Sequence, residues 1–142
     1  MALRALNLMI GDWVKVTDDD TDDSFIGQVK AIDELENINV QEGEDVAYPY
    51  SIDCLEPIPL TPEILEKNGF VKQGFDGWEI DHKNDDGIMD WMTLWRNDYI
   101  RPHLLIKSFV SLLGSFSSFG INYVHQLQHA LRLCGIEKEI EL

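Results

Sequence analysis

The sequence predicts an α+β protein in which a small N-terminal β-barrel is followed by an antiparallel meander, a C-terminal helix and a short terminal strand. Residues 1–58 contain short alternating apolar runs spaced by roughly ten residues, as in small barrels. A proline-rich stretch at 57–62 interrupts this pattern, and residues 121–134 show helical periodicity. We therefore predict an acidic barrel-like part at 1–58 and an α+β part at 59–142, and leave open whether they pack as one unit.

The N-terminal part is expected to consist of short strands separated by turns. Gly11-Asp12 predicts a tight turn or bulge that leads into the first strand, which contains Val14 and Val16. Further strands are expected at 25–32, 38–40 and 50–55. The acidic runs at 18–23 and 42–45 predict solvated loops between them.

The proline-rich bridge leads into a short helix at 62–68. Pro57 and Pro59 cannot donate a backbone hydrogen bond to a sheet. Thr61 is a suitable N-cap residue, and proline is favoured at the first helical position that follows it. Gly69 then predicts the end of the helix.

The C-terminal part is expected to be a meander followed by one longer helix. Strands are expected at 70–72, 78–80, 89–96 and 104–113, with turns at Asp76-Gly77 and Asp86-Gly87. The glycine- and serine-rich residues 114–120 predict a flexible connection. A helix at 121–134 would place its apolar side chains on one broad side, and the alternating residues 136–142 predict the terminal strand.

The net charge restricts the partners of the protein. The 142 residues include 26 acidic and 11 basic side chains, a net charge of -15. Residues 1–60 hold 14 acidic and 3 basic side chains (net -11), and residues 61–142 hold 12 and 8 (net -4). Because nucleic-acid binding requires a basic surface, we expect no direct phosphate binding by the N-terminal part.

The composition also indicates the cellular setting. The sequence has no apolar run of membrane-spanning length and no signal peptide pattern, so we expect no membrane partner and a cytoplasmic location, in a bacterium or an infected host. Cys54 and Cys134 are far apart and lie in apolar patterns, which predicts buried free thiols.

No motif for catalysis or metal binding is complete. The loop at 18–23 has Asp23 where a calcium-binding EF-hand loop requires glycine. His125 and His129 have the spacing of a helical zinc pair and are weak metal candidates, but Gln126 replaces the glutamate of the enzyme motif. A surface or interface pair is the favoured interpretation. We therefore expect no enzyme, no metal and no cofactor.

Protein binding is the function that the residues favour. Aromatic side chains fill small β cores and are also enriched at interfaces, and the interface interpretation is strongest for the two tyrosines near the last barrel strand. The expected interaction residues are Asp18, Asp19, Asp20, Asp22, Asp23, Tyr48 and Tyr50. A basic protein partner would suit them. The alternatives are a DNA mimic that inhibits a host nucleic-acid-binding or defence protein, and a virion structural or decoration component. The oligomeric state stays open.

Three stretches of the chain carry a resemblance to a known family. They are Ile10-Gly-Asp-Trp-Val14, Pro57-Ile-Pro-Leu-Thr-Pro-Glu-Ile-Leu-Glu-Lys-Asn-Gly-Phe70, and Tyr123-Val-His-Gln-Leu-Gln128 followed by Gly135-Ile-Glu. In the order and spacing of these three stretches, the chain resembles a family of short hypothetical proteins of phages, prophages and mobile elements of gut anaerobic bacteria. The resemblance implies a phage or mobile-element setting and a two-part layout, and it carries no catalytic residue over. The opening Gly-Asp-x-Val also resembles the start of SH3-like barrels, a fold with many functions.

Overall fold

The computed structural model describes residues 3–18, 21, 23–74, 77–83, 89–97, 103–109, 120–133 and 135–142. These residues form helices and antiparallel sheets, so the predicted α+β class is confirmed. The chain divides into two compact units. Unit 1 comprises Met1–Pro59 and Tyr123–His125, and unit 2 comprises Leu60–Asn122 and Gln126–Leu142.

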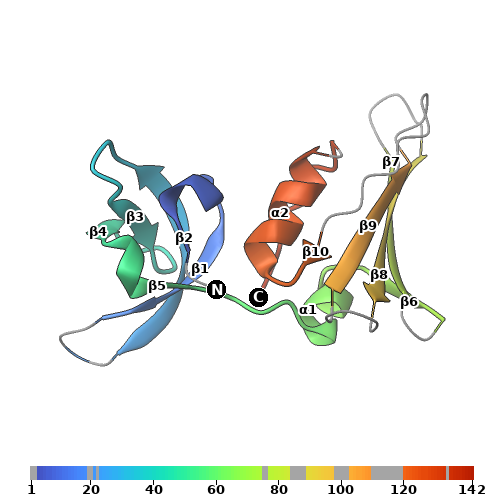
Figure 1. Cartoon of the computed structure of the whole chain (residues 1–142), viewed down its shortest axis with the longest axis horizontal. Helices are drawn as coiled ribbons and strands as arrows, with labels where there is room; N and C mark the ends of the chain where they lie inside the picture. The colour runs from blue at the N-terminus through green and yellow to red at the C-terminus, as the bar shows by residue number, and fades with distance from the viewer. Residues whose placement is uncertain are drawn as a thin grey trace. The chain divides into compact units, whose positions relative to one another are not determined.

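Unit 1 is an antiparallel sheet with two short 3-10 turns (Figure 1). Its elements are η1 (Ala5–Asn7), β1 (Trp13–Thr17), β2 (Ser24–Ile32), β3 (Ile38–Gln41), β4 (Tyr48–Tyr50), η2 (Ile52–Cys54) and β5 (Leu55–Pro57). The strand order is β4-β3-β2-β1-β5. The described strands thus form an open sheet in place of the small barrel predicted at 1–58. The edge strands β4 and β5 are short and contain Pro49 and Pro57, which lack the N–H that further pairing would need.

The predicted strand at 50–55 is also wrong, because the chain turns within it. Ile52–Cys54 form η2, and the side chain of its N-cap Ser51 accepts a hydrogen bond from the Asp53 N–H (3.5 Å). Only after this turn does the chain extend again as β5, which pairs with β1. A short polar side chain that bonds the backbone two residues on competes with strand pairing, and an alternating pattern does not reveal it.

The turn predicted at Gly11-Asp12 is present and holds the N-terminal segment to the sheet. Gly11 has a φ of 91°, which glycine adopts without strain. The buried carboxylate of Asp12 accepts a hydrogen bond from the Met9 N–H (2.7 Å). The Asp12 carbonyl oxygen accepts another from the Val29 N–H (2.9 Å), which joins the turn to β2.

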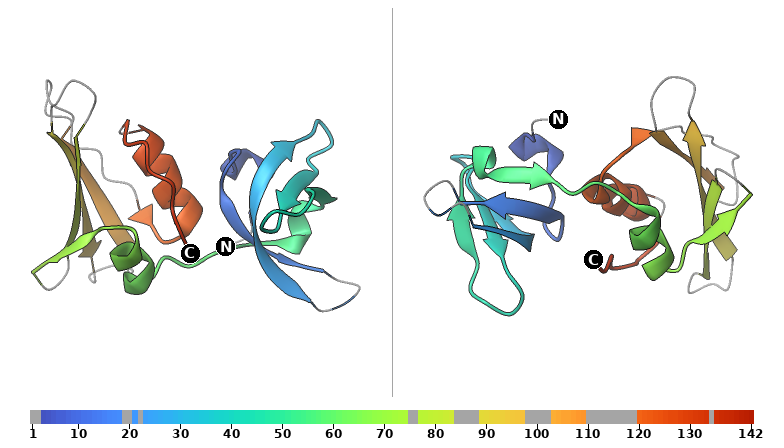
Figure 2. Two further views of the ribbon diagram at one scale, coloured as in Figure 1. Left: turned by 180° about the vertical axis from the view of Figure 1, so that it is seen from behind. Right: turned by 90° about the horizontal axis from the view of Figure 1, so that it is seen from below.

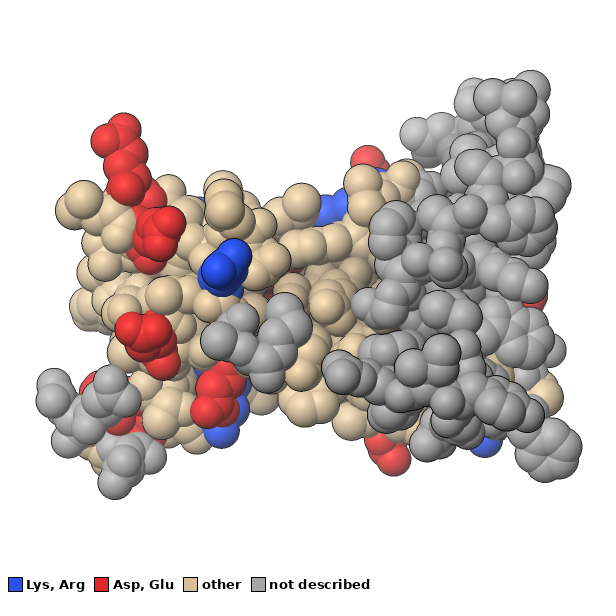
Figure 3. All heavy atoms as spheres, in the orientation of Figure 1, with Lys and Arg blue, Asp and Glu red and all other residues tan. Residues whose placement is uncertain are grey.

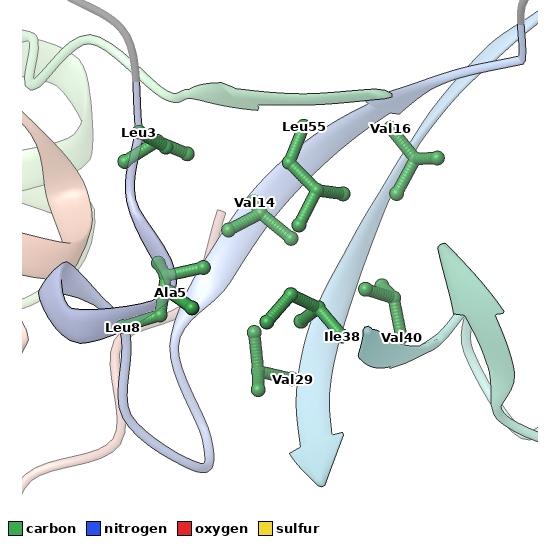
Figure 4. Packing of buried hydrophobic residues seen from close by; sticks show 9 residues of the cluster. All are labelled: Leu3, Ala5, Leu8, Val14, Val16, Val29, Ile38, Val40 and Leu55. Carbon is green, nitrogen blue, oxygen red and sulfur yellow. The ribbon is translucent and has the colours of Figure 1, made fainter. Parts of the chain in front are cut away.

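The core of unit 1 lies on one face of the sheet (Figure 4). Its buried side chains are Leu3, Ala5, Leu8, Val14, Val16, Val29, Ile38, Val40 and Leu55. In β1 buried residues alternate with half-buried ones, as expected for a strand with one covered face. Burial of a valine, leucine or isoleucine stabilises the fold by roughly 1.5–3 kcal/mol, so this cluster is the main source of stability in unit 1.

Unit 2 contains a second antiparallel sheet and most of the helical residues. Its sheet has the order β10-β9-β8-β7-β6, which confirms the predicted meander, and Figure 2 shows α1 and α2 on the same side of it. The elements from residue 60 onward are α1 (Pro62–Lys67), β6 (Val71–Gln73), β7 (Gly77–Lys83), β8 (Met89–Asn97), β9 (His103–Phe109), β10 (Gly120–Ile121) and α2 (Val124–Leu133). The predicted turn residues Asp76, Asp86 and Gly87, the end of the fourth predicted strand at 110–113, and residues 114–119 of the expected connection lie outside the described residues.

The helix predicted at 62–68 is present as α1. The Thr61 hydroxyl accepts a hydrogen bond from the Ile64 N–H (3.4 Å), and Pro62 lies at the first helical position. Hydrogen bonds from its own backbone N–H and from the Thr61 side chain lower the pKa of the Glu63 carboxyl. Gly69, with a φ of 82°, follows the helix end as predicted.

The helix predicted at 121–134 begins later, at Val124. Ile121 instead belongs to β10, and the side chain of Gln126 accepts a hydrogen bond from the Asn122 N–H (2.8 Å) just before the helix. This bond satisfies a backbone donor at the helix start, where the helix itself supplies no acceptor. The apolar side is buried as predicted, through Val124, Leu127, Ala130 and Leu131.

The terminal strand predicted at 136–142 is wrong. Ile136 and Ile140 are buried, so the alternating pattern is respected, but no strand forms in this segment. Its backbone is held by a side chain instead. Asn68 accepts a hydrogen bond from the Glu141 N–H (2.8 Å) and donates one to the Glu141 carbonyl oxygen (2.7 Å).

Candidate interaction surface

The two tyrosines predicted to bind a partner lie on an edge strand. In the pairing of β4 with β3, Tyr48 is opposite Val40 and Tyr50 is opposite Ile38. Opposite residues of an antiparallel pair share a face, so both tyrosines lie on the face that carries the core. Tyr48 is 60% exposed, whereas Tyr50 is half-buried and packs against the core cluster.

Phe25 extends this pair of tyrosines onto β2. It is opposite the buried Val16 of β1 and packs partly buried against the core. Its ring meets that of Tyr50 edge-on, with 5.8 Å between the ring centroids. Aromatic pairs favour this geometry. We call Phe25, Tyr48 and Tyr50 the aromatic surface.

Two acidic loops bring negative charge to the aromatic surface. Burial raises the pKa of the Tyr50 hydroxyl, and the negative charges of Asp18 and Glu42 raise it further. Asp18 follows β1, and its N–H donates a hydrogen bond to the Asp23 carbonyl oxygen (3.0 Å). Glu42 follows β3, and its carbonyl oxygen accepts a hydrogen bond from the Asp45 N–H (3.0 Å). Carboxylates from loops distant in sequence therefore act on one tyrosine.

The structure brings together part of the predicted site. After burial, the negative charge of Asp18 is the next largest cause of the raised pKa of the Tyr50 hydroxyl, and Tyr48 raises this pKa as well. Asp23, whose carbonyl oxygen accepts a hydrogen bond from the Asp18 N–H, has an exposed side chain, while Asp19, Asp20 and Asp22 lie outside the described residues.

Sequence reasoning missed Phe25 and Glu42 as members of this site. Phe25 begins the apolar pattern of a predicted strand, and Glu42 begins the second predicted acidic turn. The sequence therefore predicted the strand and the turn to which these residues belong. Only the pairing of β2, β3 and β4 shows that this strand and this turn lie beside the tyrosines.

A further acidic loop presents an apolar tip. In the turn between β2 and β3, Asp33 accepts hydrogen bonds from the N–H groups of Leu35 (2.8 Å) and Asn37 (2.9 Å) and from the Asn37 side chain (2.8 Å). The bond from the Asn37 side chain is the largest cause of the lowered pKa of the Asp33 carboxyl. The Leu35 side chain is 83% exposed.

The weak metal candidates His125 and His129 lie on α2 without a third ligand among the described residues. His125 is buried, not on the surface as expected, and its ring stacks on that of Tyr123 with 6.0 Å between the centroids. Within the described part of the chain, no group of three His, Cys, Asp or Glu side chains could hold a metal ion. The buried side of α2 is wide enough to include His125, because Gln128, one turn further along the helix, is also buried.

The thiol predictions need one correction. Cys54 forms no disulfide bond with another described residue, and it is half-buried where a buried thiol was expected. It lies in the η2 turn, not within a strand that would cover it. Cys134 lies outside the described residues.

Comparison of the whole chain with protein-family models, with curated proteins and with solved structures finds no match. Among the described residues, none of the helices combines the length and apolar character of a membrane-spanning segment. The functional assignment therefore depends on the geometry and charge of the candidate surface itself.

Proposed function

We propose that this chain is a non-enzymatic accessory protein of a phage or mobile element that binds a basic protein partner through unit 1. The observation that carries this proposal is the aromatic surface, whose half-buried Tyr50 is influenced by carboxylates from two separate loops. Tyrosines are common anchors of protein interfaces, and the exposed Tyr48 is available to a partner.

The distribution of charge supports a basic partner. Residues 1–60 have a net charge of -11, and their described carboxylates come mainly from the loops around 18, 33–36 and 42–45. On the face drawn in Figure 3, the acidic side chains over the unit 1 strands lie in separate groups. The electric field of this excess negative charge accelerates association with a positively charged partner and makes the association rate sensitive to salt.

We propose further that unit 1 is an SH3-like domain. Two features support this. The last strand, β5, pairs with β1 at one edge of the order β4-β3-β2-β1-β5, and a 3-10 turn connects β4 to β5. Because such small β domains have many functions, this likeness supplies the scaffold and not the activity.

The placement of the carboxylates favours a protein partner over mimicry of DNA. A mimic needs charges repeated like phosphates, about 1.7 Å per charge along a duplex axis. In the described part of unit 1 the acidic residues lie mainly in turns that differ in shape. One is the turn closed by the hydrogen bond from the Asp45 N–H to the Glu42 carbonyl oxygen, and another is the loop in which the Asp33 carboxylate accepts a hydrogen bond from the Leu35 N–H. Turns of different shape do not repeat their charges at a regular spacing.

The test is capture of a partner by the full chain, followed by measurement of its association rate at increasing salt. We expect a basic protein whose association slows as salt rises. The matched variants are Glu42→Gln/Glu44→Gln/Asp45→Asn in unit 1 and Glu137→Gln/Glu139→Gln/Glu141→Gln in the C-terminal tail, which change the net charge equally. The unit 1 variant should associate more slowly than the tail variant. Equal rates for both variants, or a rate independent of salt, would contradict the proposal.

A further inference from the structure

Building on the proposed function, we propose that the aromatic surface binds an arginine side chain of the basic partner, with Asp18 and Glu42 supplying the opposite charge. The proposed site comprises Phe25, Tyr48, Tyr50, Asp18 and Glu42, all within unit 1.

The strand register places the two tyrosine side chains next to each other on one face of β4. Tyr48 and Tyr50 are two residues apart on one strand face, a separation of about 7 Å along the strand. The two side chains are therefore neighbours on one face, and a side chain that lies along β4 would contact both of them. The Phe25 ring packs edge-on against the Tyr50 ring, with 5.8 Å between the centroids. Tyr48 is 60% exposed to solvent.

The charges around the rings select a cation. Asp18 and Glu42 act on Tyr50 from the loops after β1 and β3. The nearest basic side chain in β1, Lys15, lies on the opposite face from Val16 and forms an ion pair with Glu56 (3.1 Å). Asp18 and Glu42 therefore make the surroundings of Tyr50 negative, and these charges would repel an acidic peptide or a nucleic acid.

Arginine fits this surface better than lysine. Its guanidinium group is planar, stacks on aromatic faces and donates several hydrogen bonds in one plane to carboxylates. The lysine ammonium is a compact, strongly hydrated charge that gains less from ring stacking. A surface built from rings with carboxylates at its margin therefore favours arginine.

The test uses three peptides that differ at one position, which is arginine, lysine or citrulline within an otherwise identical glycine- and serine-containing sequence. Citrulline keeps the planar shape of arginine and lacks its charge. Binding to the full chain is measured by calorimetry or by NMR titration. We expect the arginine peptide to bind more tightly than the lysine peptide and the citrulline peptide to bind least.

Matched variants locate the binding site. Tyr48→Ala removes an exposed ring and should weaken binding of the arginine peptide about twofold to thirtyfold, the range of a cation–π contact. Leu35→Ala removes a comparably exposed apolar side chain from another loop and should leave binding unchanged. Asp18→Asn should weaken binding more than Glu34→Gln, although both variants lose one negative charge.

The outcomes separate this proposal from the proposed function. If the arginine peptide binds but Tyr48→Ala and Asp18→Asn behave like their controls, the arginine site is wrong and only general attraction of basic partners remains. If neither the arginine nor the lysine peptide binds at low salt, both the arginine site and the basic partner are contradicted. Preference for lysine over arginine would also overturn the proposed site.

Discussion

Gly27 lies at a point of β2 where the sheet leaves no room for a methyl group. A Cβ atom at this position would lie 2.6 Å from Cγ1 of Val40 and 2.7 Å from the carbonyl oxygen of Gln41. Both distances are well below van der Waals contact, and the second atom belongs to the backbone, which cannot rotate away. Gly27 therefore allows β2 and β3 to pack closely beneath the aromatic surface.

We predict that Gly27→Ala destabilises unit 1 by about 1–3 kcal/mol, the cost of overpacking a well-filled core. The change can be followed by hydrogen exchange of the Val29 amide, which is bonded to the Asp12 carbonyl oxygen. Ser24→Ala, at the exposed start of the same strand, is the control and should have little effect. Unchanged exchange in Gly27→Ala would show that the strands are more widely spaced than described.

Asn68 connects two ends of unit 2 through one side chain. It is 2% exposed, and its amide group donates hydrogen bonds to the carbonyl oxygens of Ile64 (2.8 Å) and Glu141 (2.7 Å). Its side-chain oxygen accepts a hydrogen bond from the Glu141 N–H (2.8 Å). The Lys67 ammonium also donates a hydrogen bond to the Leu142 carbonyl oxygen. The C-terminal tail is thus fixed to the end of α1.

We predict that Asn68→Asp destabilises unit 2 by about 1–3 kcal/mol at neutral pH. The substitution keeps the shape of the side chain but removes both N–H donors, so that a carboxylate faces two carbonyl oxygens. The Glu141 amide should exchange faster, and the unfolding midpoint should fall. Lys67→Met, which removes an exposed contact to the same tail, is the comparison and should cost less. An Asn68→Asp protein as stable as the parent would contradict the assigned bonds.

The loop between β2 and β3 depends on one ionised side chain. Asp33 accepts hydrogen bonds from both Leu35 and Asn37, and Glu36 has a φ of 61° within the same loop. A left-handed backbone in a non-glycine residue requires local support, which the Asp33 carboxylate provides.

The Asp33 loop should loosen on acidification. The pKa of Asp33 is lowered below the ordinary value of 3.8, so its stabilising effect is complete above that value and is lost as the pH falls through the lowered pKa. NMR titration of the Leu35 and Asn37 amides measures this transition. In Asn37→Ala, which removes the largest cause of the shift, the Asp33 pKa should rise toward 3.8. An Asp33 pKa that is the same in both proteins would contradict the described loop.

Some elements could be predicted from the sequence because their signals are local. The cap of α1 by Thr61 and Pro62 is of this kind, as is the turn at Gly11. The elements that sequence reasoning misplaced depend on distant partners. Residues 136–142 alternate like a strand, but the side chain of Asn68 holds their backbone in place of a neighbouring strand. Likewise, His125 is buried together with Gln128, so the buried side of α2 is wider than its apolar side chains indicate.

The negative charge is distributed unevenly along the chain. Residues 1–60 hold a net charge of -11 and residues 61–142 hold -4. The sequence alone therefore indicated which part would attract a basic partner. The composition could not indicate the aromatic surface, because Phe25, Tyr48 and Glu42 are separated in sequence and meet only through the pairing of β2, β3 and β4. The function that we propose requires both features.

The most direct test of the central claim is an NMR titration of the full isotope-labelled chain with the arginine peptide. We predict saturable shifts concentrated at the amides of Thr17, Asp18, Phe25, Glu42, Tyr48 and Tyr50, and their weakening as salt is raised. The amides of unit 2, such as those of Leu65 and Leu131, should not move. Shifts confined to unit 2, or shifts that increase without saturation at every acidic loop alike, would contradict recognition of a basic partner by the aromatic surface.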